Sequence, residues 1–184
     1  MIRNIVIVSI VAICVLLSCA SNGADAFEKI PSCSEYVEMI RPQIPLEQTG
    51  TFGKIFGQID TLHAVAQIVG GKSSLTEEAL LDSLISNIKK CIPKLVIVKG
   101  FKRNEASIRL LVDMTAGKGD LFYGFVSVEL SRKVEILRTK YEEDCEVWSD
   151  DVAFCEQRDP RPRIWWLVQL QATKFAAMWT IGNQ

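Results

Sequence analysis

The hydrophobic period of the chain changes at Pro93, and this change limits the fold more than any other feature. Before Pro93, apolar residues recur at the three- and four-residue spacing of amphipathic helices. After it, short segments rich in β-branched and aromatic residues alternate with turn residues, over 94–101, 106–114, 121–130, 133–139 and 163–173. This order predicts an α+β domain in which N-terminal amphipathic helices precede an antiparallel β-meander.

Residues 74–92 carry the clearest helix pattern. Ser74 followed by Glu77 predicts a capping box, and Pro93 ends the segment. Acidic residues lie in its first turn and lysines in its last, which complements the helix dipole. One face is apolar, and it consists of Leu80, Leu81, Leu84, Ile85 and Ile88.

The stretch "TFGKIFGQIDTLHAVAQIVGG", beginning at Thr51, also fits a helical period and predicts a helix over 52–69. Its glycines lower its intrinsic helicity, so it needs a surface on which to fold. That surface is either the protein's own core or a bilayer. The residues expected to contact a membrane in the second case are Phe52, Ile55, Phe56, Ile59, Leu62, His63 and Val69.

The first 26 residues have the layout of a secretory signal peptide: Arg3, an apolar run, then small residues. The sequence "ADA" predicts cleavage after Ala26, with Ala20 as the competing site, and a secreted, extracellular protein. A single-pass anchor and a bacterial lipobox that would acylate Cys19 are the alternatives. The remaining chain is expected to form one domain.

Within that domain, three regions are expected. They are 27–50, a short helix and a proline-containing linker; 51–92, two amphipathic helices; and 93–184, an antiparallel β-rich region.

Four cysteines follow the signal segment, an even number that predicts two disulfides in one of three connectivities. We expect Cys145–Cys155 to staple a short acidic loop or hairpin, and Cys33–Cys91 to tie the N-terminal segment to the end of a later helix. No Cys-x-x-Cys spacing occurs and His63 is the only histidine, so neither a metal nor another cofactor is expected.

The sequence contains no motif for catalysis. A nucleophile elbow, a P-loop and a dinucleotide-binding loop are all absent. Nucleic acid is not expected as a partner, because the chain is predicted to be exported and has no aromatic-basic motif. His63 lies mid-face in the predicted helix, where it is either a hydrogen-bonded core histidine or a pH-sensitive membrane contact. An enzyme is therefore not expected.

The order of the parts resembles the trialysin and redulysin type of secreted cytolytic proteins from the saliva and venom of true bugs. "FGKIF" and the run after it are similar to the lytic segment, and "ASIRLLVDM", "FVSVELSRKVEIL" and the Cys145–Cys155 pair are similar to the β domain. The resemblance covers Phe52 to Gln171. It implies a venom or salivary-type toxin that permeabilises a lipid membrane through its amphipathic helix.

Two alternatives stay open beside membrane action. One is a secreted, non-enzymatic binding module that encloses an apolar ligand between helices and sheet. The other is an inhibitor or effector that contacts a protein target, with the acidic cysteine loop at the contact. A pocket between helix and sheet would favour the first, and a filled core would favour the second.

Overall fold

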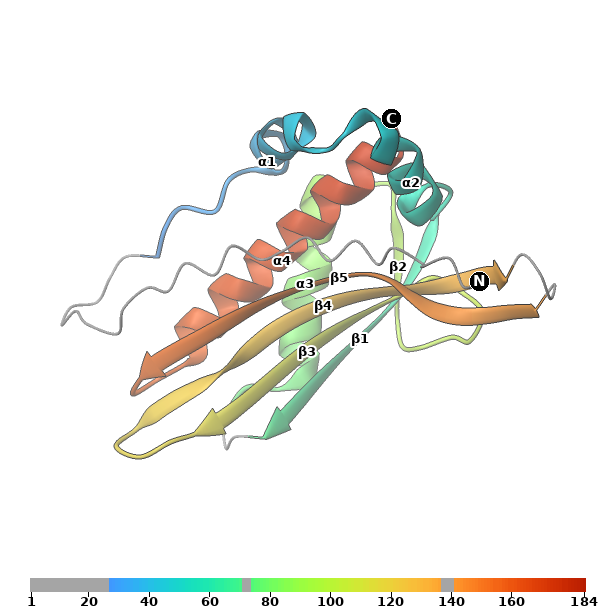
Figure 1. Ribbon diagram of the computed structural model, residues 1–184. Coiled ribbons are helices and arrows are strands. Elements are labelled where there is room, and N and C mark those ends of the chain that lie inside the picture. The colour runs from blue at the N-terminus through green and yellow to red at the C-terminus, as the bar shows by residue number, and fades with distance from the viewer. Residues whose placement is uncertain (1–26, 71–73, 137–140) are drawn as a thin grey trace, which may run out of the picture.

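A five-stranded sheet with helices against one face forms the fold (Figure 1). The computed structural model describes residues 27–70, 74–136 and 141–184, so the predicted signal peptide lies outside the described residues. In chain order the elements are α1 (Cys33–Ile40), the 3-10 turn η1 (Arg41–Gln43), α2 (Leu46–Phe56), β1 (Thr61–Gly70), α3 (Glu77–Cys91), β2 (Val96–Lys99), β3 (Ser107–Ala116), β4 (Leu121–Ile136), β5 (Tyr141–Gln157) and α4 (Arg161–Gly182).

The strand order is β2-β1-β3-β4-β5. β1 runs parallel to β2 and β3, whereas β3, β4 and β5 form an antiparallel meander. The predicted α+β class is therefore confirmed, but the order of helices followed by strands is wrong. β1 precedes α3 as an interior strand, and α4 follows the whole sheet, so neither 51–92 nor 93–184 has the predicted content.

The predicted helix over 52–69 is two different elements. α2 ends at Phe56, Gly57 and Gln58 leave the helical conformation, and β1 begins at Thr61. β1 hydrogen-bonds to a strand on each side, and its inward residues Leu62 and Ala64 are fully buried. A helix here would leave the facing edges of β2 and β3 unpaired, which explains why the strand is favoured.

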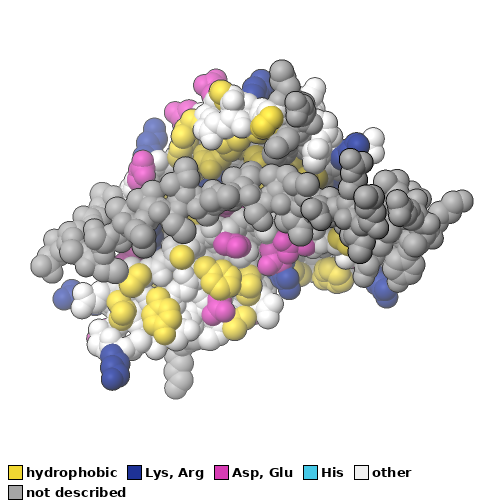
Figure 2. All heavy atoms as spheres, viewed as in Figure 1, with side chains coloured by type: hydrophobic (Ala, Val, Ile, Leu, Met, Phe, Trp, Pro, Cys, Tyr) yellow, Lys and Arg dark blue, Asp and Glu magenta, His cyan; other side chains and the backbone are white. Residues whose placement is uncertain are grey.

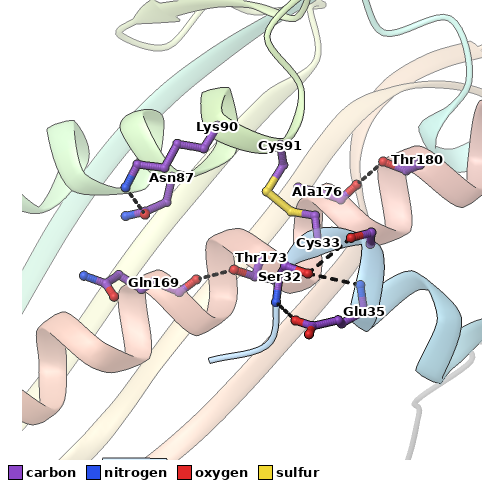
Figure 3. Close-up of a disulfide and its surroundings, with 11 residues drawn as sticks. Ser32, Cys33, Glu35, Asn87, Lys90, Cys91, Gln169, Thr173, Ala176 and Thr180 are labelled. Carbon is purple, nitrogen blue, oxygen red and sulfur yellow. Dashed lines mark hydrogen bonds between the residues drawn. A yellow bond between two sulfur atoms is a disulfide. The ribbon is translucent and has the colours of Figure 1, made fainter. Parts of the chain in front are cut away.

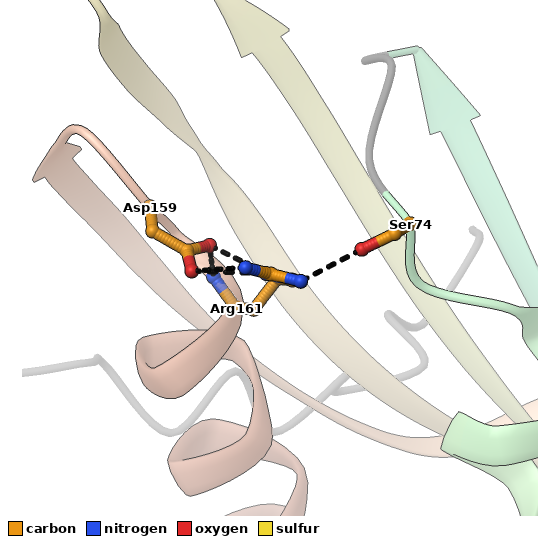
Figure 4. A network of polar contacts seen from close by, with 3 residues as sticks. All are labelled: Ser74, Asp159 and Arg161. Carbon is orange, nitrogen blue, oxygen red and sulfur yellow. Dashed lines mark hydrogen bonds and ion pairs between the residues drawn. The ribbon is translucent and has the colours of Figure 1, made fainter.

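The predicted strand over 163–173 is also wrong, because these residues lie in the 22-residue helix α4. α4 packs against α1, α2, α3 and the sheet, so it is apolar nearly all round and lacks a single hydrophobic stripe. Arg161 fixes its start: the guanidinium forms a bidentate contact with Asp159 and donates from Nη1 to Ser74 Oγ at 2.9 Å (Figure 4).

The helix predicted over 74–92 is confirmed as α3, with a different N-cap. Thr76 Oγ1 accepts the hydrogen bond from the Ala79 amide, while Ser74 binds Arg161 and Glu77 Oε1 accepts from the Ile68 amide. The predicted apolar face does point inward, with Ile85 half-buried and the rest of its members buried: Leu80, Leu81, Leu84 and Ile88.

A disulfide between Cys33 and Cys91 joins α1 to the end of α3, as predicted (Figure 3). α1 begins with a capping box, in which Ser32 Oγ accepts from the Glu35 amide and the Glu35 carboxylate accepts from the Ser32 amide. These hydrogen bonds lower the pKa of Glu35. Only Val37 of α1 is buried, so the disulfide supplies much of what holds this short helix in place.

The predicted Cys145–Cys155 disulfide is wrong. Both cysteines lie in β5, an extended strand rather than a loop. Ten residues of strand span about 33 Å, whereas disulfide-bonded residues have Cα atoms about 4.4–6.8 Å apart. Cys145 is opposite Arg132 and Cys155 is opposite Tyr123, toward the two ends of the β4–β5 ladder.

Candidate functional site: the open face of the sheet

The residues predicted to contact a membrane do not form one surface. Phe56, Ile59 and Leu62 are buried in the core, Ile55 is half-buried, and Val69 lies on the opposite side of the sheet with 40% of its surface exposed. The side chain of Phe52 lies outside the described residues. A shared apolar face on one helix therefore does not exist in this fold.

Phe56 has an anchoring role inside the core. Its ring meets the rings of Trp148 from β5 and Phe175 from α4, with centroid distances of 5.8 and 6.0 Å, and those two rings lie 5.8 Å apart. The three aromatic rings fill the space between α2, α4 and the sheet. Most residues between helices and sheet are buried, so protein side chains fill this layer.

His63 is a hydrogen-bonded, buried histidine, the simpler of the two interpretations of its sequence position. Its Nε2 lies 2.8 Å from Glu105 Oε2, and Lys102 pairs with the other carboxylate oxygen. The hydrogen bonds from Lys102 and then from His63 lower the pKa of Glu105. This cluster joins β1 to the loop before β3, and it has a structural explanation.

The open face is the side of the sheet opposite α3 and α4. Side chains alternate along each strand, and those on the helix side are buried, so the alternate set faces outward. Among the outward residues, Val69, Leu121 and Tyr123 are exposed, and Phe125 beside them is half-buried. We name these four residues the distal patch. Figure 2 shows hydrophobic and acidic side chains gathered on the visible part of this face.

Register explains why the patch is continuous. Val69 and Phe125 are both register partners of Asp113, on its two sides, and Tyr123 is two residues from Phe125 on β4. Tyr123 is 47% exposed, which is high for a ring in the interior of a sheet. Aromatic side chains presented in this way are typical anchors of protein–protein interfaces.

The charged groups of the open face are mostly acidic. Asp113 lies within the distal patch and Asp151 lies on β5, while Arg109 is neutralised by Glu129, with Nε 2.8 Å from Oε2. A partner that covers this face therefore meets apolar and negative groups together, and it is best matched by apolar and basic side chains.

Other candidate sites are weaker. In the described ranges, no three His, Cys, Asp or Glu side chains are placed to hold a metal ion. A surface concavity of about 510 Å³ lies beside α1, lined by Lys29, Pro31, Glu35, Glu38 and Met39. Glu35 is already engaged in the capping box, and the concavity lies outside the layer between helices and sheet.

The distal patch was missed by sequence reasoning, although a signal for it exists. In "LFYGFV", beginning at Leu121, both alternate sets of residues are apolar or aromatic, whereas a strand with one solvated face alternates with polar residues. Apolar residues on both faces of a strand indicate a binding surface where no described element covers one of the two faces.

The chain matches no protein-family model and no curated protein sequence. Among solved structures it is similar to the PelC dodecamer from Paraburkholderia phytofirmans, with a TM-score of 0.39 at 10% identity over 65% of this chain and 87% of that chain. A DUF330 protein from Xanthomonas campestris gives a TM-score of 0.35 at 9% identity, over 66% of this chain and 83% of that chain. A minor lipoprotein from Acinetobacter baumannii gives a TM-score of 0.27 at 11% identity, over 64% of this chain and 87% of that chain.

These TM-scores carry no argument about assembly or function. The resemblance to trialysin-type proteins rests on the order of sequence segments and stays a prediction. Of the helices described, including α4, none combines the length and the hydropathy that crossing a bilayer requires.

Proposed function

We propose that this chain is an exported, non-enzymatic binding module that holds a protein partner on the open face of its sheet. The observation that carries the proposal is the distal patch, an exposed apolar cluster with Tyr123 at its centre. Export rests on the signal-like first 26 residues and agrees with the Cys33–Cys91 disulfide, since disulfides persist in oxidising compartments.

The chemistry of the face defines the partner. The apolar side chains of the distal patch favour an apolar anchor residue, and Asp113 and Asp151 favour lysine or arginine beside it. An enclosed apolar ligand is a poorer match, because the layer between helices and sheet is occupied by protein side chains.

Membrane permeabilisation is the competing proposal, and the fold makes it costly. Phe56, Ile59 and Leu62 would have to leave the core, at about 1.5–3 kcal/mol for each large side chain. Dye release from anionic vesicles by the oxidised, folded protein would favour this proposal over protein binding.

A photo-crosslinking experiment tests the binding proposal. Benzoylphenylalanine replaces Tyr123 in the full chain expressed in its native host, and in a matched control it replaces Met39, which is 56% exposed on α1. We expect a protein adduct at position 123 that excess wild-type chain suppresses and the Tyr123→Asp variant does not. The crosslinked peptide should contain an apolar residue beside a lysine or arginine.

Two results would overturn the proposal. Identical adducts at positions 123 and 39 would mean that Tyr123 marks no specific surface. Lipid adducts at position 123, together with vesicle leakage, would replace the protein partner with a membrane.

A further inference from the structure

We infer that the outer edge of β5, from Ser149 to Ala153, binds an extended basic segment of the partner as an added strand. This inference rests on the proposed function for the existence of a protein partner. It adds the mode of recognition, in which backbone hydrogen bonds extend the sheet.

Among the described residues, β5 is the last strand of the sheet and pairs with β4 on one side only. At the end of the β4–β5 ladder the Arg158 amide donates to the Asp120 carbonyl at 2.7 Å, so Asp120–Arg158 is a hydrogen-bonded pair. Hydrogen-bonded pairs recur every two residues in an antiparallel ladder, so Val126–Val152 and Val128–Asp150 belong to the same set.

The remaining set on β5 faces away from the sheet. Ser149, Asp151 and Ala153 fall between the hydrogen-bonded pairs, so their amides and carbonyls point toward the outer edge. The β3–β4 ladder gives the same assignment. The Gly117 amide donates to the Leu121 carbonyl, so the backbone groups of odd-numbered β4 residues bind β3, and those of even-numbered β4 residues bind β5. Within the described ranges, nothing pairs with these outward groups of Ser149, Asp151 and Ala153.

The side chains leave this edge accessible. Ser149, Asp151 and Ala153 are all exposed and short, and no proline interrupts β5. Ala153 is the register partner of Phe125, so a large apolar side chain on an added strand can lean over Ala153 toward the distal patch. The edge and the patch therefore form one continuous surface.

Charge selects the added strand. Asp150, on the helix side, pairs with Lys174 at 2.6 Å, whereas Asp151 faces the open side opposite Ser127 and has no ion-pair partner in the part of the chain described. A basic residue opposite Asp151 on the added strand would form an ion pair with its carboxylate, since opposite charges on facing strands attract.

A second copy of the chain is a poor occupant. Symmetric antiparallel pairing centred on Asp151 places this carboxylate opposite its own mate, and like charges directly opposite repel. The Asp151 carboxylate therefore disfavours pairing of this edge with a second copy and favours pairing with a basic strand.

Amide hydrogen exchange with two synthetic peptides, (Thr-Lys)₄ and (Thr-Glu)₄, tests the inference on the oxidised full chain. Saturating (Thr-Lys)₄ should slow exchange at the Ser149, Asp151 and Ala153 amides by about tenfold or more, as expected for newly formed strand hydrogen bonds. The Val152 amide already binds β4 and should not change.

Three variants sharpen the test. Asp151→Lys should weaken (Thr-Lys)₄ binding roughly fivefold and favour (Thr-Glu)₄ instead. Ala153→Pro removes one outward donor without touching the β4 ladder and should also reduce binding. Glu78→Lys, on α3 beside β2 at the opposite edge of the sheet, is the charge-matched control and should have little effect.

Several outcomes would overturn the edge assignment. They are unchanged exchange at the three amides under saturating (Thr-Lys)₄, equal losses of binding in Asp151→Lys and Glu78→Lys, and concentration-dependent protection of the edge without peptide. If the Tyr123 crosslink persists in Asp151→Lys while the edge shows no protection, the proposed function stands and the edge inference fails. If the edge is protected but the crosslink is absent, the distal patch loses its role.

Discussion

At the scale of single residues, a polar cluster around Asp150 lies inside the helix–sheet layer. Lys174 of α4 pairs with Asp150 of β5, and Gln171 Nε2 donates to the Asp150 carbonyl at 3.0 Å. Tyr36 of α1 lies beside this pair. Burial, and then the charge of Asp150, raise the pKa of Tyr36 to about 12 from 10.0.

This pKa predicts an alkaline loss of stability. Between pH 10 and about 12 the unfolded chain releases the Tyr36 proton and the native state retains it, so the free energy of unfolding falls as pH rises. Below pH 10 the contribution is fully present. An ultraviolet titration should show one tyrosine ionising near pH 12, and Tyr36→Phe should remove this transition. A transition that persists in the variant would contradict the assignment.

At the scale of elements, α2 is held at its C-terminal end by side chains distant in sequence. Arg132 of β4 donates from Nη1 to the Lys54 and Ile55 carbonyls, both at 2.8 Å, and Asn183 donates to the Phe56 carbonyl at 3.0 Å. A cation at this end also complements the helix dipole. α2 contains two glycines, Gly50 and Gly53, so these contacts replace the helicity that its sequence lacks.

Arg132→Met should therefore lower the free energy of unfolding by about 1.5–3 kcal/mol, the usual contribution of hydrogen bonds from a charged donor. Urea unfolding measures the change, and faster amide exchange in α2 would locate it. The control is Lys99→Met, which breaks the exposed pair with Asp82 and should cost no more than about 1 kcal/mol. Equal losses in both variants would contradict a capping role for Arg132.

At the scale of the whole molecule, aromatic, hydrogen-bond and disulfide contacts join the N-terminal region to the rest of the domain. The Phe27 ring stacks on the Trp166 ring with their centroids 6.0 Å apart, and Trp166 Nε1 donates to the Glu28 carbonyl at 2.8 Å. The Cys33–Cys91 disulfide then links α1 to α3. The disulfide closes a loop with a sequence separation of 58 residues. It therefore restricts the unfolded chain strongly.

Replacing both cysteines by serine, in Cys33→Ser/Cys91→Ser, should lower the free energy of unfolding by about 4 kcal/mol. Thermal or urea unfolding measures this loss, and Cys145→Ser serves as the control with little effect expected. A non-reducing peptide map should link Cys33 to Cys91. A map that links Cys33 to Cys145 or Cys155 would contradict the fold described.

Local patterns in the sequence were sufficient for several elements. α3 has a continuous helical period with charges suited to its ends, and β3 and β4 have β-branched residues bounded by the turn "GKGD". The Cys33–Cys91 disulfide was predicted by elimination, after the pairing of Cys145 with Cys155, and the structure contains only the first of the two within the described residues. In these segments the local preference and the tertiary environment agree, so the sequence alone predicts the outcome.

Only the tertiary structure decided β1, α4 and the candidate site. The apolar residues of 52–69 fit a helix and a strand about equally, and pairing with β2 and β3 selected the strand for 61–70. α4 is surrounded by other elements, so its sequence shows no single apolar stripe and its aromatic residues suggested a strand. The open face exists because both long helices pack on the same side of the sheet, and this choice depends on contacts between segments that no local pattern records.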